Sequence, residues 1–152
     1  MLFLWVFGSH LERSMGHLRY LAFYLLCGLG ASALEIATAA NSTVPGLGAS
    51  GAISGVLAAY LLLYPTSTVS TLLPISYLVI PIRLPAWLMI AGWFALQLVY
   101  GVASLSPNAG ADLGGVAYWA HVGGFLTGAT LIWLFQRPDY VRQIRAYQGQ
   151  AA

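Results

Sequence analysis

Ser50 and His121 are the two side chains of this chain whose types suit the hydrolysis of a carbonyl compound. Ser50 stands among small residues in Gly48-Ala49-Ser50-Gly51, and His121 stands in a long apolar run. A serine hydroxyl attacks a carbonyl only when a base such as a neutral imidazole approaches it to about 2.6 to 3.2 Å. The pair therefore predicts a serine–histidine dyad, provided that the fold brings the two residues together.

Glycines near both residues favour such an approach. Gly51 and Gly55 are four residues apart, and Gly124 and Gly128 repeat the spacing. Small residues at this spacing let two membrane helices pack closely. We therefore expect these four glycines to pack the helix of Ser50 against the helix of His121.

The start of the Ser50 helix meets a second requirement of this chemistry. The first N–H groups of a helix have no partner within the helix, and the helix dipole adds positive potential there. Such donors stabilise the oxyanion of an acyl-transfer intermediate. The backbone N–H groups of Gly48, Ala49 and Ser50 are the predicted donors.

Both residues also have purely structural interpretations. A membrane histidine often hydrogen-bonds a neighbouring helix, and small residues four apart are common in packing alone. Glu35 and Asp112 are interpreted as loop or helix-end residues. Asp112 lies nine residues before His121 in a glycine-rich loop, so a dyad is preferred over a triad.

The composition indicates the solvent in which these residues must be positioned. Of the 152 residues 59% are hydrophobic and 7% are charged, with a mean hydropathy of +0.78. A soluble domain carries about a quarter charged residues, so the chain is predicted to lie in a lipid bilayer.

All six basic residues are arginines and form no basic run, which argues against nucleic acid as a partner. Cys27 is the single cysteine, so no disulfide, metal site or cofactor is expected.

The apolar runs predict an all-α fold, a polytopic bundle of membrane helices. We expect a membrane domain over residues 1–137 and a cytoplasmic tail over 138–152. A partial helix is predicted at 1–8, before a polar turn from Ser9 to His17, and spans are predicted at about 18–40, 50–66, 85–105 and 115–135. Prolines at 65, 74, 81 and 85 argue against a straight span between 65 and 85, where an interfacial or broken segment is expected.

Alternating spans place all six arginines on one side, which the positive-inside rule makes cytoplasmic. The helices of Ser50 and His121 are separated by one span, so they run in the same direction. Both residues are then expected near the outer face of the membrane, with the carboxy terminus in the cytoplasm.

At these residues the chain resembles the rhomboid family of intramembrane serine proteases. Gly48-Ala49-Ser50-Gly51 resembles the family's nucleophile motif, residues 120–128 (AHVGGFLTG) resemble its histidine motif, and Gly8, Glu12 and Gly16 resemble a family turn. The resemblance implies that Ser50 is the nucleophile and His121 the general base and then acid. It also implies substrates that are transmembrane proteins, cut near the outer end of their helix.

The resemblance also implies two mobile segments, and the chain differs from many relatives at one position. It implies a lateral gate at residues 85–105 and a lid at 105–118. Many relatives carry an aromatic ring where this chain has Ser54, so a hydrogen bond from Ser54 is expected instead.

The family's first core helix and the histidine and asparagine that assist its oxyanion precede a stretch like Met1 to Gly8. The chain is therefore expected to be the carboxy-terminal two-thirds of a rhomboid, either as part of a longer protein or as a shortened relative. Without the pair it is expected to be less active or inactive. The alternative is a non-catalytic rhomboid-like protein that binds membrane helices. A transporter or channel fits less well, because no internal repeat is visible. The compact layout favours a bacterial inner membrane, and the sequence predicts no oligomeric state.

Overall fold

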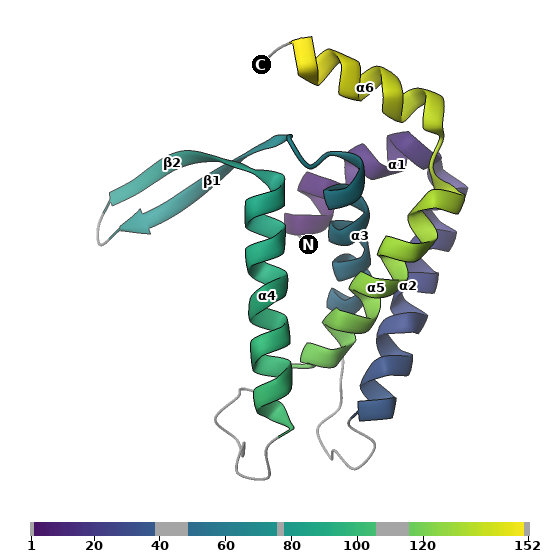
Figure 1. Cartoon of the computed structure of the whole chain (residues 1–152), viewed down its shortest axis with the longest axis vertical. Helices are drawn as coiled ribbons and strands as arrows, with labels where there is room; N and C mark the ends of the chain where they lie inside the picture. Colours follow the sequence, from purple (N-terminus) through teal and green to yellow (C-terminus); the bar gives the residue numbers. More distant parts are fainter. Residues whose placement is uncertain (1, 39–48, 76–77, 106–115, 151–152) are drawn as a thin grey trace.

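The structure of the protein is a computed structural model that describes residues 2–38, 49–75, 78–105 and 116–150, without the side chains of 72–80 and 147–150. Its elements, in chain order, are a π-helical turn η1 (Leu4–Gly8), α1 (Ser9–Met15), α2 (His17–Thr38), α3 (Ser50–Leu63), β1 (Thr68–Ile75), β2 (Leu78–Pro85), α4 (Ala86–Ser104), α5 (Tyr118–Phe135) and α6 (Pro138–Gln150). Helices α2 to α5 form a bundle, and α6 lies across one end of it near α1 (Figure 1).

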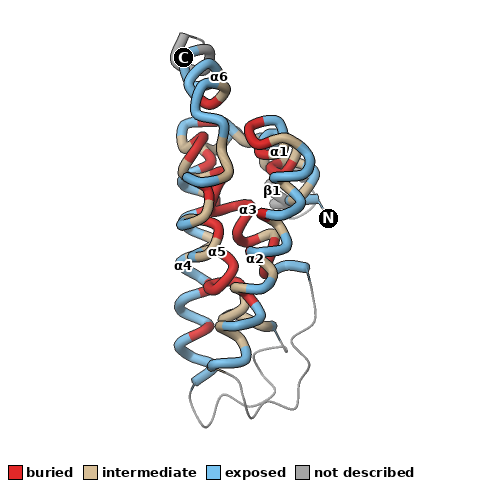
Figure 2. The backbone as a smooth tube through the Cα atoms, turned by 90° about the vertical axis from the view of Figure 1, so that its right-hand side faces the viewer, coloured by how far each residue is buried: buried red, intermediate tan, exposed pale blue. Residues whose placement is uncertain are grey.

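Helix α3 occupies the centre of the bundle. Ten of its fourteen residues are buried, and most of them are small or aliphatic. Helix α2 buries a narrower stripe, Phe23, Cys27 and Ala31, at the four-residue spacing that keeps side chains on one helix face. The buried parts of α3 and α5 lie together in the interior (Figure 2). These two helices, with α2, therefore form the core that positions Ser50 and His121.

The outer faces of the helices are apolar. On α2 the side chains of Leu18 and Leu29 are 83% and 67% exposed, and on α5 Leu134 is 77% exposed. Such surfaces are costly in water and suit a lipid environment. Helices α2 and α4 are long and apolar enough to cross a membrane, whereas the apolar α3 has only fourteen residues. The number of spans therefore stays a prediction.

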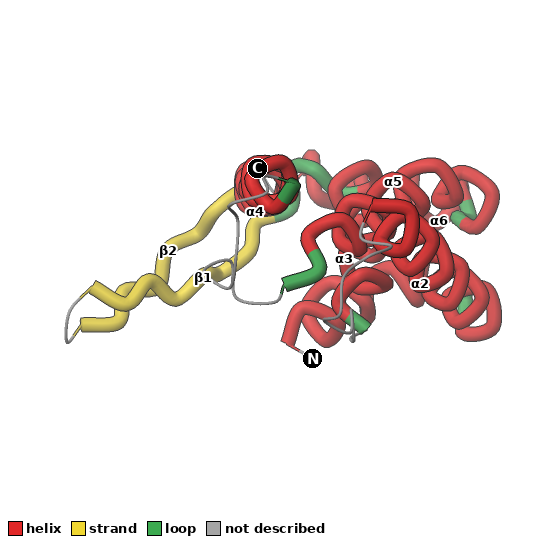
Figure 3. Tube along the Cα trace, turned by 90° about the horizontal axis from the view of Figure 1, so that it is seen from below, coloured by secondary structure: helices red, strands yellow, loops and turns green. Residues whose placement is uncertain are grey.

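A β-hairpin follows α3, so the prediction of an all-α chain is correct for the bundle and wrong for residues 68–85. The strands β1 and β2 pair antiparallel from Thr68–Pro85 to Ile75–Leu78. The hairpin extends away from the bundle beside the start of α4 (Figure 3). Both strands are edge strands, which tolerate the missing N–H groups of Pro74 and Pro81. The expectation that this segment is not a straight membrane helix is confirmed.

Both terminal segments are more helical than expected. The predicted polar turn from Ser9 is the helix α1, which ends at Met15 and is followed by Gly16 with a positive φ of 92°. The predicted tail contains α6, whose Arg145 donates hydrogen bonds of 2.7 Å from Nε to the Leu63 carbonyl and from Nη2 to the Leu62 carbonyl. Because the last carbonyls of a helix lack partners within it, Arg145 caps the carboxyl end of α3 and holds α6 on the bundle.

Candidate active site

The contact between α3 and α5 is made through backbone atoms at the predicted glycines. A Cβ atom added at Gly124 would overlap the Gly51 carbonyl, and one added at Gly128 would overlap the Gly55 carbonyl. Because residue numbers rise together along both helices, α3 and α5 run parallel. Gly51 also faces the carbonyl of Ala120, at 3.2 Å from an added Cβ. The helix turn that follows Ser50 therefore packs against the turn that contains His121.

Ser50 is the first residue of α3, and its side chain is exposed within this chain. Ala49 is the N-cap residue, with no side-chain hydrogen bond at the cap, and its carbonyl accepts a 3.0 Å bond from the Ile53 N–H. The N–H groups of the first turn have no partner in the helix ladder, as expected for oxyanion donors. Gly48, the remaining predicted donor, lies outside the described residues.

His121 is buried, with 8% of its surface exposed, although it lies only three residues after the start of α5. Its Nδ1 is 2.8 Å from Oε1 of Gln97 on α4. With the Gln97 carbonyl oxygen in this position, the matching tautomer of a neutral ring carries the proton on Nδ1 and keeps Nε2 as an acceptor. The indole of Trp93, one turn before Gln97, lies 5.5 Å from the imidazole between ring centroids. Helix α4 thus orients the ring and offers an acceptor to Nδ1.

Ser54 makes the hydrogen bond that its position predicts. Its hydroxyl donates a 2.6 Å bond to the backbone carbonyl of His121. The bond goes to the backbone and leaves the imidazole to Gln97. Within the described residues no hydrogen bond joins Ser50 to His121, so the structure brings the two residues to the same level without direct contact of their polar atoms.

Glu35 reaches the same site from α2. Its Oε2 accepts a 2.9 Å hydrogen bond from the backbone N–H of Ala120, in the first turn of α5. The helix-end position expected for Glu35 is correct, but the carboxylate caps a neighbouring helix. A negative charge is also favourable at a helix amino terminus. Asp112 lies outside the described residues, as does most of the predicted lid at 105–118.

The roles of two polar residues of this site were missed from the sequence. Gln97 belongs to the buried stripe of α4 with Ala86, Ile90 and Gly101, and it is the polar member of that stripe. A polar side chain on the core face of an apolar helix is a recognisable signal of a functional or bridging residue. The capping role of Glu35 has no such signal, since it depends on how α2 packs against α5.

The described residues contain no group of three His, Cys, Asp or Glu side chains close enough to hold a metal ion. The arrangement defines a class of protein: an apolar helix bundle with a serine at one helix start and a buried, oriented histidine on the parallel helix beside it. Acyl transfer without a cofactor is the chemistry that suits these groups.

Comparison with known proteins supplies the family. Residues 1–138 match the family model described as Rhomboid domain. The chain therefore belongs to the rhomboid family, as its motifs predicted. It is 29% identical over 141 residues to Rhomboid-like protein 11, chloroplastic, of Arabidopsis thaliana; the match covers 89% of this chain and 45% of that protein. The chain thus spans less than half the length of this relative. No solved structure matches the chain. Family membership and the apolar helices together indicate a membrane protein.

Proposed function

We propose that this rhomboid-family chain is an intramembrane serine endopeptidase that cuts transmembrane helices near their outer end. The observation that carries the proposal is the buried imidazole of His121. Gln97 holds it at 2.8 Å in the tautomer with a free Nε2, and it lies on the helix that packs in parallel against the helix of Ser50. A base fixed in this state is what an activated serine needs.

The mechanism assigns a role to each group. Nε2 of His121 takes the proton of the Ser50 hydroxyl as the oxygen attacks the peptide carbonyl, and the first-turn N–H groups of α3 stabilise the oxyanion. The imidazolium then returns the proton to the leaving amine, which departs and leaves an acyl-serine. Water hydrolyses the acyl-serine with His121 again as base. The mechanism requires that a rotation of the Ser50 side chain brings its hydroxyl to Nε2.

Labelling with a fluorophosphonate tests this proposal, because the probe reacts with an activated serine. The purified chain in detergent is compared with Ser50→Ala, His121→Ala and the matched control Ser104→Ala. Ser104 lies at the end of α4 and bonds the Gly101 carbonyl. We expect labelling that is lost in the first two variants and kept in the control. Labelling that survives Ser50→Ala and His121→Ala would show that the dyad does not operate.

A second function is favoured by a different observation. Ser50 is exposed and has no hydrogen bond to His121 within the described part of the chain, while the glycine packing of α3 and α5 is complete. A non-catalytic rhomboid-like protein that binds membrane helices has this combination. It predicts no probe labelling in the chain, together with binding of a labelled transmembrane peptide that Ser50→Ala leaves unchanged.

A further inference from the structure

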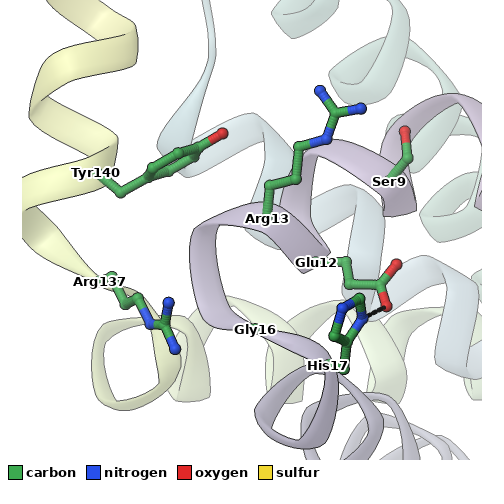
Figure 4. A pocket seen from close by; sticks show the side chains of 7 residues that line it. All are labelled: Ser9, Glu12, Arg13, Gly16, His17, Arg137 and Tyr140. Carbon is green, nitrogen blue, oxygen red and sulfur yellow. Dashed lines mark hydrogen bonds and ion pairs between the residues drawn. The ribbon is translucent and has the colours of Figure 1, made fainter.

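A cavity of about 600 Å³ lies at the opposite end of the bundle from Ser50, between α1, the start of α2 and the junction of α5 with α6. Its lining includes Glu12, Arg13, His17, Arg137 and Tyr140 (Figure 4). Two guanidinium groups, an imidazole and a phenol therefore border one space. These are the groups that bind phosphate in proteins, by charge and by hydrogen bonds.

In the part of the chain that the structure describes, the two arginines of this cavity form no ion pair. The chain contains four acidic residues, and three of them lie in the described part. Glu12 is hydrogen-bonded to His17 Nδ1, Asp139 pairs with Arg142, and Glu35 caps α5. Among the described residues neither Arg13 nor Arg137 forms an ion pair with any of them. The cavity therefore keeps a net positive charge that an anion would neutralise.

The fold builds the position of Arg137. Its backbone N–H donates a 2.8 Å hydrogen bond to the Ser14 carbonyl, at the end of α1. Its guanidinium lies over Gly16, where an added Cβ would come within 2.9 Å of Nη2. Gly16 also has the positive φ that favours glycine. The glycine turn thus fixes where Arg137 lies, and Arg13, from α1, lines the same cavity with its exposed side chain.

Apolar surface begins where the cavity ends. Leu18 and Leu21, in the first turns of α2, are 83% and 54% exposed, and Trp133 and Leu134, in the last turn of α5, are 56% and 77% exposed. A molecule with its phosphate in the cavity would extend its apolar part along these side chains.

We propose that the cavity binds the phosphate group of an anionic phospholipid from the membrane leaflet at the arginine-bearing end. Basic pockets between helices at a membrane surface suit such headgroups.

Lipid binding is measured by native mass spectrometry of the purified chain in zwitterionic detergent, titrated with phosphatidylglycerol or with phosphatidylcholine. We expect phosphatidylglycerol to be retained more strongly. Arg13→Gln and Arg137→Gln should each weaken its binding by about fivefold, the effect of one arginine at a membrane surface. Arg142→Gln, which removes an arginine already paired with Asp139, is the matched control and should leave binding unchanged.

Glu12→Gln gives an effect of opposite sign. Removal of the one carboxylate in the lining should tighten binding of phosphatidylglycerol several-fold, a gain that a misfolded variant cannot produce.

Equal losses in Arg13→Gln, Arg137→Gln and Arg142→Gln would overturn the proposal in favour of general surface charge. Inorganic phosphate at millimolar concentration identifies the source: complete displacement of the lipid would mean that a soluble phosphate is the ligand and would overturn the lipid assignment. All of these measurements are independent of proteolysis.

Discussion

The imidazole of His121 is restrained by contacts from two neighbouring helices. Gln97 and Trp93 of α4 hold the ring, and Ser54 of α3 holds the backbone carbonyl of the same residue. Catalytic groups work best when neighbouring side chains lock their rotamers and tautomers. Gln97 takes the orienting position that an acid occupies in a serine–histidine–aspartate triad, but it carries no charge. We regard it as a positioning residue.

Replacement of Gln97 tests this role. Gln97→Leu should reduce fluorophosphonate labelling roughly tenfold, because Nδ1 loses the acceptor that fixes the tautomer. Gln97→Glu should restore most of the labelling, since a carboxylate oxygen also accepts from Nδ1–H. Leu96→Ala, on the exposed neighbour of Gln97, is the control and should have little effect.

A spectroscopic measurement separates positioning from packing. The nitrogen chemical shifts of the His121 ring report which nitrogen carries the proton, whether or not the chain is active. In the wild type we expect the Nδ1-protonated form, and in Gln97→Leu a mixture of both tautomers. An unchanged tautomer in Gln97→Leu would contradict the positioning role.

At the residue scale, the sequence predicts the candidate reacting residues better than the residues that orient them. The motifs single out Ser50, His121 and the glycines at 51, 55, 124 and 128, and the structure places the glycines at the contact of α3 with α5. The roles of Ser50 and His121 stay predictions until labelling tests them. Gln97 was visible as a polar residue in an apolar run, but its partner is 24 residues away and depends on the packing of α4 against α5.

At the scale of elements, the approach of α3 to α5 depends on the absence of side chains at the contact. Gly124→Ala places a methyl group against the Gly51 carbonyl, so the helices must separate or the backbone must shift. We expect a loss of about 1 to 3 kcal/mol in the free energy of unfolding, measured by titration with a denaturing detergent. Labelling of Ser50 should fall as well.

Gly92 provides the matched control for this substitution. It lies within α4, and nothing is within 4 Å of an added Cβ. Gly92→Ala should therefore leave the free energy of unfolding unchanged or raise it by about 0.5 to 1 kcal/mol, because alanine favours helix more than glycine. If the two variants unfolded alike, the close contact of α3 with α5 would be wrong.

The cap from Glu35 predicts a local effect at the start of α5. Glu35→Ala leaves the Ala120 N–H without its acceptor and should cost about 1 kcal/mol of stability in the first turn. The measurement is hydrogen exchange at the Ala120 amide, which should become faster in Glu35→Ala. Glu35→Gln keeps a carbonyl oxygen as acceptor and should show a smaller change, so equal exchange in all three proteins would exclude the cap.

Elements that follow a simple period were easier to predict than those that do not. The apolar runs coincide with α2 to α5, because length and hydrophobicity are enough to predict an apolar helix, and of these helices α2 and α4 are long and apolar enough to cross a membrane. The hairpin was missed because the prolines argued only against a helix. Its β-branched residues, such as Val69, Thr71 and Ile82, were the signal for strands. The capping of α3 by Arg145 joins residues more than 80 positions apart and has no sequence pattern.

At the scale of the whole molecule, the arginines and the candidate catalytic residues lie at opposite ends of the bundle. Arginines occur in α1, in the first turn of α2, in β2 and in α6 with the junction before it, and these segments lie at the end of the bundle crossed by α6 (Figure 1). The starts of α3 and α5, with Ser50 and His121, lie toward the other end (Figure 1). The positive-inside rule then predicts that the arginine-bearing end faces the cytoplasm and the candidate active site the outer side.

This orientation can be measured with single cysteines, because the native Cys27 is fully buried and should react little with a thiol reagent. Gln143→Cys places a thiol on the exposed face of α6, and Val116→Cys places one just before α5, where the side chain is 46% exposed. In spheroplasts, a membrane-impermeant maleimide should label Val116→Cys and spare Gln143→Cys until the membrane is opened by detergent. The reverse pattern would place Ser50 and His121 on the cytoplasmic side and would rule out cleavage at the outer end of substrate helices. Equal labelling of both variants in intact cells would mean that the positive-inside rule does not fix the orientation of this chain.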